Sequence, residues 1–419
     1  MRGEPEGQNW PRPYLENMDY KNPDRITKLR WSLPWLLRYP GWRWRRMKSV
    51  ARERRKSRPA VVLVVANHFE PAWSGTGVAL GIHEQISRVE SWCGKARRVG
   101  KLIRDFDGVP FKHTNFYPGE QYCRELLDLL AELQFEGCGE VEIHLHHGVG
   151  LPDTAQNLRR TLVEFRDLLA GEHKCLSRLM AAPTPMYGFV HGNFALGNSA
   201  GGRCCGVDSE LQVLAETGCY ADFTLPSAPD QSQVAQINAI YECGGRLDRR
   251  RAHNTGPALG MTRPPTLPIL ITGPLVLDWR GRRFGLPRPR LDCGALARNQ
   301  PLDIARFHKW MDAGISVDGR PEWIFVKLFC HGFFPQDEDY CIGEPLIRSL
   351  DTLLNEAHRT GEFTVHFATA REAFNIAMAA AHGKSGEPGQ FRDYLLSPIM
   401  RPTRRAQVSE IHEQRKAVV

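Results

Sequence analysis

The chain alternates strand-like apolar runs with amphipathic helix-like segments between residues 60 and 380. The first run holds five consecutive apolar residues, from Val61 to Val65, which is typical of a parallel strand buried on both faces. Strands that alternate with helices favour a parallel sheet, either as a (β/α) barrel or as a doubly wound sheet. We expect an α/β fold, namely an irregular barrel of seven or eight strands with an N-terminal basic extension.

Charge divides the chain into three expected parts, which are a Trp/Arg-rich arm (1–58), the barrel (59–383) and a polar tail (384–419). The formal net charge is +8, and residues 21–58 hold 14 Lys/Arg against 2 Asp/Glu. The body is therefore close to neutral, which argues against a nucleic-acid partner. Pro34 and Pro40 predict that no long helix runs through the arm. Its Trp and Arg residues suit either a strap packed on the barrel or peripheral contact with an anionic membrane.

The eleven cysteines are odd in number and include no C-x-x-C pair, which predicts reduced thiols rather than disulfides or a zinc ribbon. No stretch approaches the roughly 20 apolar residues of a membrane-spanning helix. The first 20 residues lack the apolar core of a secretory signal. We expect a cytoplasmic protein that is either free or peripheral to the inner membrane face. No glycine-rich loop has the spacing of a phosphate site, so no nucleotide cofactor is expected.

Polar residues collect where the predicted strands end. In the strand over 141–147, Glu142, His144 and His146 share one face, and two His residues two positions apart can converge on one cation. At the end of the first strand, His68 and Glu70 also share a face. Each of these two is a candidate metal ligand or a candidate base that activates water.

Three further predicted strands carry polar groups near their ends. His191 and Asn193 follow one apolar run, Asp222 lies in the next strand, and His331 ends the strand WIFVKLFCH. Each unpaired polar group inside a core costs about 1–3 kcal/mol, so a shared site is the simpler explanation for this recurrence. His366 is more interior to its strand and is expected to be a core residue.

The order of these motifs resembles the polysaccharide deacetylase family, within the glycoside hydrolase/deacetylase barrel superfamily. The matching segments are NHFEP (67–71), EIHLHHG (142–148), HGNFALGN (191–198), the helix and strand up to Asp222, and the L-x-x-H that ends at His331. More closely, the chain resembles deacetylase-like proteins found with bacterial exopolysaccharide genes.

The resemblance implies a metal-dependent hydrolase that removes an acyl group, typically N-acetyl, from a carbohydrate by cleaving an amide C–N bond. It implies a divalent metal ion, with zinc expected, held by Glu70, His144 and His146. His68 or Glu70 would be the base and His331 the general acid, while a set of three residues would contact the substrate: His191, Asn193 and Asp222. The first motif lacks the usual Asp pair, and the His residues are two rather than four apart.

Two alternatives remain from the sequence. A glycoside hydrolase of a related barrel would use the carboxylates of Glu70 and Asp222. A catalytically degenerate barrel would instead bind carbohydrate or act as a scaffold at the membrane surface, with the basic arm as its functional part.

Overall fold

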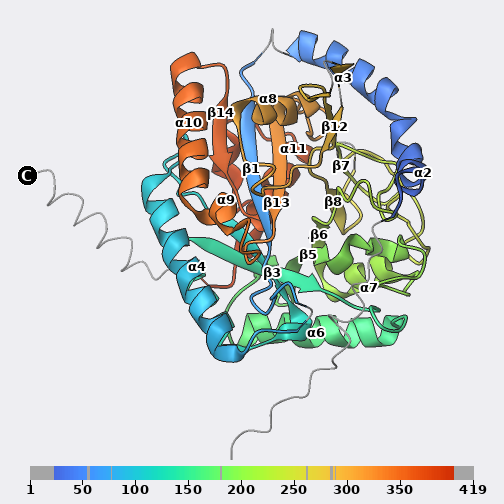
Figure 1. Cartoon of the computed structure of the whole chain (residues 1–419), viewed down its shortest axis with the longest axis vertical. Helices are drawn as coiled ribbons and strands as arrows, with labels where there is room; N and C mark the ends of the chain where they lie inside the picture. The colour runs from blue at the N-terminus through green and yellow to red at the C-terminus, as the bar shows by residue number, and fades with distance from the viewer. Residues whose placement is uncertain are drawn as a thin grey trace, which may run out of the picture.

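The structure is a computed structural model that describes residues 23–53, 57–76, 78–179, 182–260, 263–283, 286–287 and 289–400. Its centre is an 11-stranded sheet (Figure 1). The strands lie in the order β13 (Trp323–Cys330), β1 (Ala60–His68), β2 (His113–Pro118), β3 (Gly139–Leu145), β5 (Pro185–His191), β6 (Cys219–Asp222), β8 (Ile269–Ile271) and β7 (Ile240–Tyr241). Every pairing along this order is parallel except the last, between β8 and β7. The fold is therefore mixed α/β with a mostly parallel central sheet.

Strand β1 is buried along all nine of its residues, as the apolar run predicted. It pairs with β13 on one side. On its other side, β14 (Thr364–Phe367) pairs with the first half and β2 with the last residues. Because β1 has a neighbour at both edges and is buried throughout, apolar side chains fill its positions up to Ala66, before the polar Asn67 and His68.

The described residues form ten α-helices, several of which flank the sheet (Figure 1). They are α2 (Arg25–Leu36), α3 (Tyr39–Glu53), α4 (Ile82–Leu102), α5 (Arg124–Phe135), α6 (Ala155–Gly171), α7 (Glu210–Thr217), α8 (Ile304–Ala313), α9 (Glu338–Ile342), α10 (Glu344–Thr360) and α11 (Ala370–Ala381). The short strands are β4 (Ser177–Leu179), β9 (Val276–Asp278), β10 (Arg282–Arg283), β11 (Leu286–Pro287), β12 (Arg290–Asp292) and β15 (Leu396–Pro398). In α10 the buried residues recur every three or four positions, which is the pattern of a helix with one face on the core.

Helix α11 is buried along its whole length. A capping box formed by Thr369 and Glu372 satisfies backbone N–H groups at its N-terminus. The helix contacts β1 and β5 on one side and β15 with the 3-10 turn Pro388–Phe391 on the other. This explains why α11 has no exposed face: its alanines pack in the core, and its polar residues, such as Asn375, bond within the protein.

Strand-to-strand hydrogen bonds among the described residues do not close the sheet into a ring. Strand β13 ends the order at one side, but other contacts connect it to the far strands. Its Lys327 donates from Nζ to the carbonyl oxygen of Phe223, just past β6, over 2.7 Å. The backbone of Phe329 also exchanges hydrogen bonds with Gly294 (3.1 Å) and Leu296 (2.8 Å).

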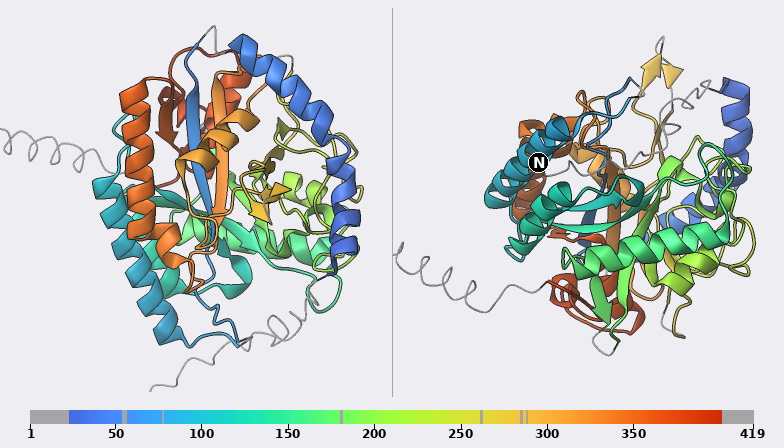
Figure 2. Two further views of the ribbon diagram at one scale, coloured as in Figure 1. Left: turned by 45° about the horizontal axis from the view of Figure 1, so that its top comes forward. Right: turned by 90° about the horizontal axis from the view of Figure 1, so that it is seen from below.

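The N-terminal arm packs against the body as α2 and α3, which run along its outer side (Figures 1 and 2). Trp35 is buried in an apolar cluster with Ala228, Ile237 and Leu275. The hydroxyl of Tyr39 accepts a hydrogen bond from the backbone N–H of Leu277 at 3.1 Å. The arm thus packs on the body as a strap, and we use this name below for α2 and α3 together. The predicted interruption of the arm is confirmed, because α2 ends at Leu36 and α3 begins at Tyr39. Pro34 itself lies in the last turn of α2.

The first part of the expected polar tail packs on the body. Strand β15 pairs with β4, and the side-chain amide of Asn375 in α11 bonds to the carbonyls of Arg392 and Leu396. The remainder of that tail, from residue 401, lies outside the described residues. In the described part of the chain, every helix is too short or too polar to cross a bilayer.

Candidate metal centre

Three histidines from different strands meet at the carboxyl end of the parallel sheet. His68 is the last residue of β1, His144 lies near the end of β3, and His331 directly follows β13. The ring centroid of His68 lies 4.9 Å from that of His144 and 4.5 Å from that of His331. The sequence predicted these residues at one site, and the sheet brings them together because its parallel strands end at the same edge.

Glu70 is the carboxylate at the centre of this cluster. Its Oε1 lies 3.4 Å from Nε2 of His144 and 3.1 Å from Nε2 of His146. His144 is fully buried, whereas the side chains of His146 and Glu70 are 14% and 13% exposed. The cluster is therefore mostly buried but open to solvent on the side of His146.

Backbone and carboxylate partners orient both imidazoles. Nδ1 of His144 donates to the carbonyl oxygen of Val190 at 2.9 Å, so in the neutral ring Nε2 presents a lone pair to Glu70. Nδ1 of His146 donates to Oε1 of Glu120 at 2.7 Å. A second partner that fixes the ring in this way is typical of histidines that bind metal through the other nitrogen.

Charge in the cluster follows from burial and from these neighbours. Burial opposes ionisation of Glu70, but the imidazoles of His144 and His146 outweigh burial and hold the pKa of Glu70 well below its ordinary value. Burial, with His331 and His144 nearby, lowers the pKa of His68 well below its ordinary value. Burial also opposes a charge on His146, yet Glu120 and Glu70 raise its pKa to about 10. At neutral pH, Glu70 is thus a carboxylate and His68 a neutral base.

The donor set fits a divalent cation. Two imidazole nitrogens and one carboxylate form a ligand set used by catalytic zinc sites, which keep a fourth position open. Donor atoms of His68, Glu70 and His144 also lie within 4.8 Å of one another. Nε2 of His144 and Oε1 of Glu70 lie 3.4 Å apart, so either a proton, as in the hydrogen bond that lowers the pKa of Glu70, or a cation can lie between them.

The three residues expected to contact substrate end or directly follow the neighbouring strands β5 and β6. His191 is fully buried, and its Nε2 lies 3.5 Å from Oε1 of Glu210. Asn193 adopts a φ of 55°, and its Oδ1 is buried without a hydrogen-bond partner. Asp222 is buried, accepts two hydrogen bonds from Thr224, and has its pKa raised to about 7 by burial. His366, expected in the core, is indeed buried and bonds to Asp107 and Thr364.

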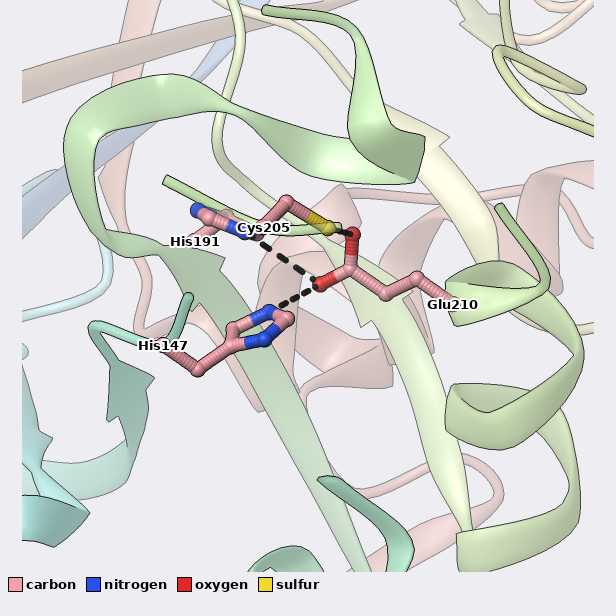
Figure 3. Close-up of side chains that lie close together, drawn as sticks. All are labelled: His147, His191, Cys205 and Glu210. Atoms are coloured by element: carbon pink, nitrogen blue, oxygen red, sulfur yellow. Dashed lines mark hydrogen bonds and ion pairs between the residues drawn. The ribbon is translucent and has the colours of Figure 1, made fainter. Parts of the chain in front are cut away.

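A second group of candidate ligands lies next to the first and was missed from the sequence. It contains His147, His191, Cys205 and Glu210 (Figure 3). His147 was noticed as part of the HLHH run, but Cys205 was expected to be a small core residue. Glu210 carries no spacing signal, because the loop that brings it to His191 lies between β5 and α7. Glu120, the partner of His146, was also missed, because it lies 26 positions before His146, in the turn after β2.

Comparison with known proteins leaves the family open: no family model matches the chain, and no curated protein matches it significantly.

Proposed function

We propose that the chain is a metal-dependent hydrolase of the polysaccharide deacetylase kind, which removes an acyl group from a carbohydrate. The observation that supports this most strongly is the position of the Glu70 carboxylate, within 3.4 Å of Nε2 of both His144 and His146. His68 and His331 stand beside these groups as candidates for proton transfer. The site thus combines a ligand set with two proton-transfer groups.

We infer in addition that the sheet curves into an irregular (β/α) barrel. The hydrogen bond from Lys327 to the carbonyl of Phe223 spans from β13 to the end of β6. The segment around Ala295 forms a parallel bridge with Phe329 and lies beside β13. In a barrel the carboxyl ends of the strands surround one mouth, which is where enzymes of this architecture hold their sites.

The proposed chemistry is hydrolysis of an amide. Glu70, His144 and His146 would hold the divalent ion, whose chemistry is to acidify water and polarise the acyl carbonyl. His68 accepts the proton of the attacking water, because burial keeps its ring neutral. Burial lowers the pKa of His331, so its ring is neutral before the reaction. The proton that His331 donates to the departing nitrogen as the C–N bond breaks is therefore the one that His68 takes from water, and the two ring centroids lie 4.5 Å apart. The products are a carboxylate and a free amine.

The experiment is hydrolysis of acetylated oligosaccharides, followed as released acetate. We expect turnover by the wild-type protein and a loss of about 100-fold or more in His331→Gln, because general acid catalysis contributes about 10²–10⁴-fold. His358→Gln, on the exposed face of α10, is the matched control and should retain wild-type turnover. Equal turnover in His331→Gln and wild type would contradict the role of His331.

The structure gives less support to glycoside hydrolysis. That reaction needs two carboxylates that flank one glycosidic bond. Asp222 was the expected partner of Glu70, but it is 1% exposed and both of its oxygens accept from Thr224. The histidines around Glu70 would also have no role in that reaction. Glycosidic bond cleavage that persists after complete metal removal would favour glycoside hydrolysis over deacylation.

We propose as a second property that the strap touches an anionic membrane. Four apolar residues of α2 and its C-cap are spaced as one helix face and are 45–79% exposed: Ile26, Leu29, Leu33 and Leu37. Arg25, Arg30 and Arg38 are exposed on the same segment. Such a combination of apolar and basic side chains favours the interface of a membrane with anionic lipids.

Vesicle sedimentation tests this second property. Wild-type protein should sediment with vesicles that contain phosphatidylserine and remain free of vesicles made of phosphatidylcholine alone. Leu29→Ser/Leu33→Ser should bind less, whereas Leu102→Ser/Leu151→Ser, which changes exposed residues far from the strap in sequence, should bind as wild type does. Equal binding of all three proteins would contradict contact through α2.

A further inference from the structure

The second cluster joins four ligand-type side chains from separate segments of the chain. His147 follows β3, His191 ends β5, Cys205 lies in the loop after β5, and Glu210 begins α7 (Figure 3). One donor atom from each lies within 4.8 Å of the other three, and all four residues are buried. We propose that His147, His191, Cys205 and Glu210 bind a second divalent metal ion, of the zinc type, which has a structural role.

The spacing of the donor atoms suits a tetrahedral ion. Oε1 of Glu210 lies 3.1 Å from Nε2 of His147 and 3.5 Å from Nε2 of His191. The other oxygen, Oε2, accepts a hydrogen bond from the thiol of Cys205 over 3.4 Å. Zinc bonds of about 2.0–2.3 Å in a tetrahedron separate the ligand atoms by roughly 3.3–3.8 Å. Two imidazoles, a thiolate and a carboxylate are ligand types that zinc accepts.

The clearest sign of a missing partner is His191. Its Nδ1 donates to the carbonyl oxygen of Gly192, so in the neutral ring Nε2 carries a lone pair. That Nε2 atom is buried, has no hydrogen-bond partner and faces the Glu210 carboxylate. A lone pair and a carboxylate that face each other in a dry interior repel, and a cation between them turns the repulsion into two bonds.

The groups behind the ligands hold them in place. Nδ1 of His147 lies 3.1 Å from Oδ2 of Asp153, a carboxylate that orients the ring as in many zinc sites. The backbone N–H of Gly197 donates to Oε2 of Glu210 at 2.6 Å. Asp153 itself accepts from the side chain of Asn157 at 2.8 Å. The ligands are thus oriented independently of one another.

A metal-free ion pair is the simpler explanation for part of the cluster. A charged His147 between Asp153 and Glu210 would be satisfied on both nitrogens. Cys205 would also be satisfied, because its thiol donates to Oε2 of Glu210. Nε2 of His191 would still have no hydrogen-bond partner. A bound ion would provide that partner and engage all four side chains.

The position of the cluster indicates a structural role. All four ligands come from within the molecule and are buried, which leaves no open position for a substrate, as in structural zinc sites. The cluster also adjoins the first site, since a Cβ on Gly192 would lie 2.3 Å from Cδ2 of His146. An ion at the second cluster would therefore hold the segments after β3 and β5 together and keep His146 in place.

Cobalt(II) distinguishes the two sites, because only the second contains a cysteine. We would purify the full chain from cobalt-supplemented medium and measure both the cobalt per chain and the thiolate-to-cobalt charge-transfer band in the near ultraviolet. Wild-type protein should show this band. Cys205→Ala should lose the band and one equivalent of cobalt, whereas the neighbouring Cys204→Ala, as control, should retain both.

These results test the second metal site without depending on whether the protein is a hydrolase. Cobalt binding without the charge-transfer band in wild type would overturn the second site, and this result needs no variant to fold. A band that persists in Cys205→Ala would overturn it too. If the protein binds one equivalent of cobalt and loses it only in His144→Ala/His146→Ala, the result would support the first site and overturn the second. If the protein binds one equivalent of cobalt with the charge-transfer band, and both are lost only in Cys205→Ala, the result would support the second site and contradict the first.

Discussion

Nδ1 of His146 lies 2.7 Å from Oε1 of Glu120, and Nε2 of the same ring lies 3.1 Å from Glu70. Glu120 belongs to the 3-10 turn that follows β2, the strand between β1 and β3 in the sheet. The ring of His146 is therefore held between two carboxylates that come from different strand ends. Without a cation, the ring is protonated and donates to both. A metal ion bound at Nε2 would replace that proton and leave Glu120 as the partner that fixes the ring.

Glu120 should therefore contribute to metal affinity without being a ligand. We expect Glu120→Gln to weaken metal binding at the first site by about 10–100-fold, the range seen when such a partner is removed. Competition with a chromophoric chelator measures this change. Glu125→Gln, on the exposed side of the first turn of α5, is the control and should bind as wild type does. Unchanged metal affinity in Glu120→Gln would show that Glu120 does not contribute to metal binding.

Two variants should distinguish Glu70, as a metal ligand, from His68, as the base. Glu70 contacts Nε2 of both His144 and His146, so Glu70→Gln should lose the metal ion of the first site. His68→Gln should retain that ion but lose turnover by about 100-fold or more, because a general base contributes about 10²–10⁴-fold. Metal content and released acetate, measured on the same preparations, test both expectations. Loss of metal in His68→Gln would make His68 a ligand instead.

Trp35 should stabilise the whole fold, because it attaches the strap to the body. Its side chain is 2% exposed and packs with Ala228, Ile237 and Leu275. We expect Trp35→Ala to lower the free energy of unfolding by about 3–5 kcal/mol, as is usual for a buried aromatic residue. Urea denaturation measures the change. Trp44→Ala, at a residue that is 56% exposed, should alter the stability much less. Similar losses in the two variants would argue against Trp35 as the anchor.

Lys327 should make stability depend on pH. Burial lowers the pKa of Lys327 from its ordinary 10.5 to about 7. Between these values the unfolded chain binds a proton that the folded chain does not, so stability rises with pH in this window. Relative to Lys327→Met, wild-type protein should gain up to about 1.4 kcal/mol per pH unit from pH 7 upwards.

Denaturation at pH 7, 8 and 9 measures this difference. Lys101→Met, at an exposed position near the end of α4, is the control and should show no such trend against wild type. A difference between wild type and Lys327→Met that stays constant or falls with pH would contradict a neutral Lys327 in the folded protein.

The sequence predicted the parts of the fold that depend on local pattern. The apolar run of β1 and the alternation of strands with helices led to the parallel sheet. Because parallel strands end at one edge, the positions of His68, His144 and His331 at strand ends were enough to predict that they meet. The arm is interrupted between Pro34 and Pro40, as predicted. The exact end of α2 was not predictable, because Pro34 lies in its last turn, where the loss of one hydrogen bond is tolerated as the helix packs through Trp35.

The second cluster depends on long-range contacts that no local pattern encodes. Glycine at 148 adopts a φ of 63°, and a Cβ there would lie 2.0 Å from the carbonyl oxygen of Cys205. This close approach brings the segment after His147 against the loop that carries Cys205. Neither the spacing of these residues nor their hydrophobicity indicates the contact. Glu120 is likewise 26 positions from His146, and the two meet only because β2 and β3 are neighbours.

Metal content by elemental mass spectrometry tests the first metal centre most directly. The comparison needs wild-type protein, His144→Ala/His146→Ala, and a control with two exposed histidines replaced, His83→Ala/His358→Ala. We predict that the His144/His146 variant holds one equivalent of zinc or a similar divalent ion less than wild type, and that the control holds the same amount as wild type. Equal metal content in all three folded proteins would contradict a metal ion at Glu70, His144 and His146.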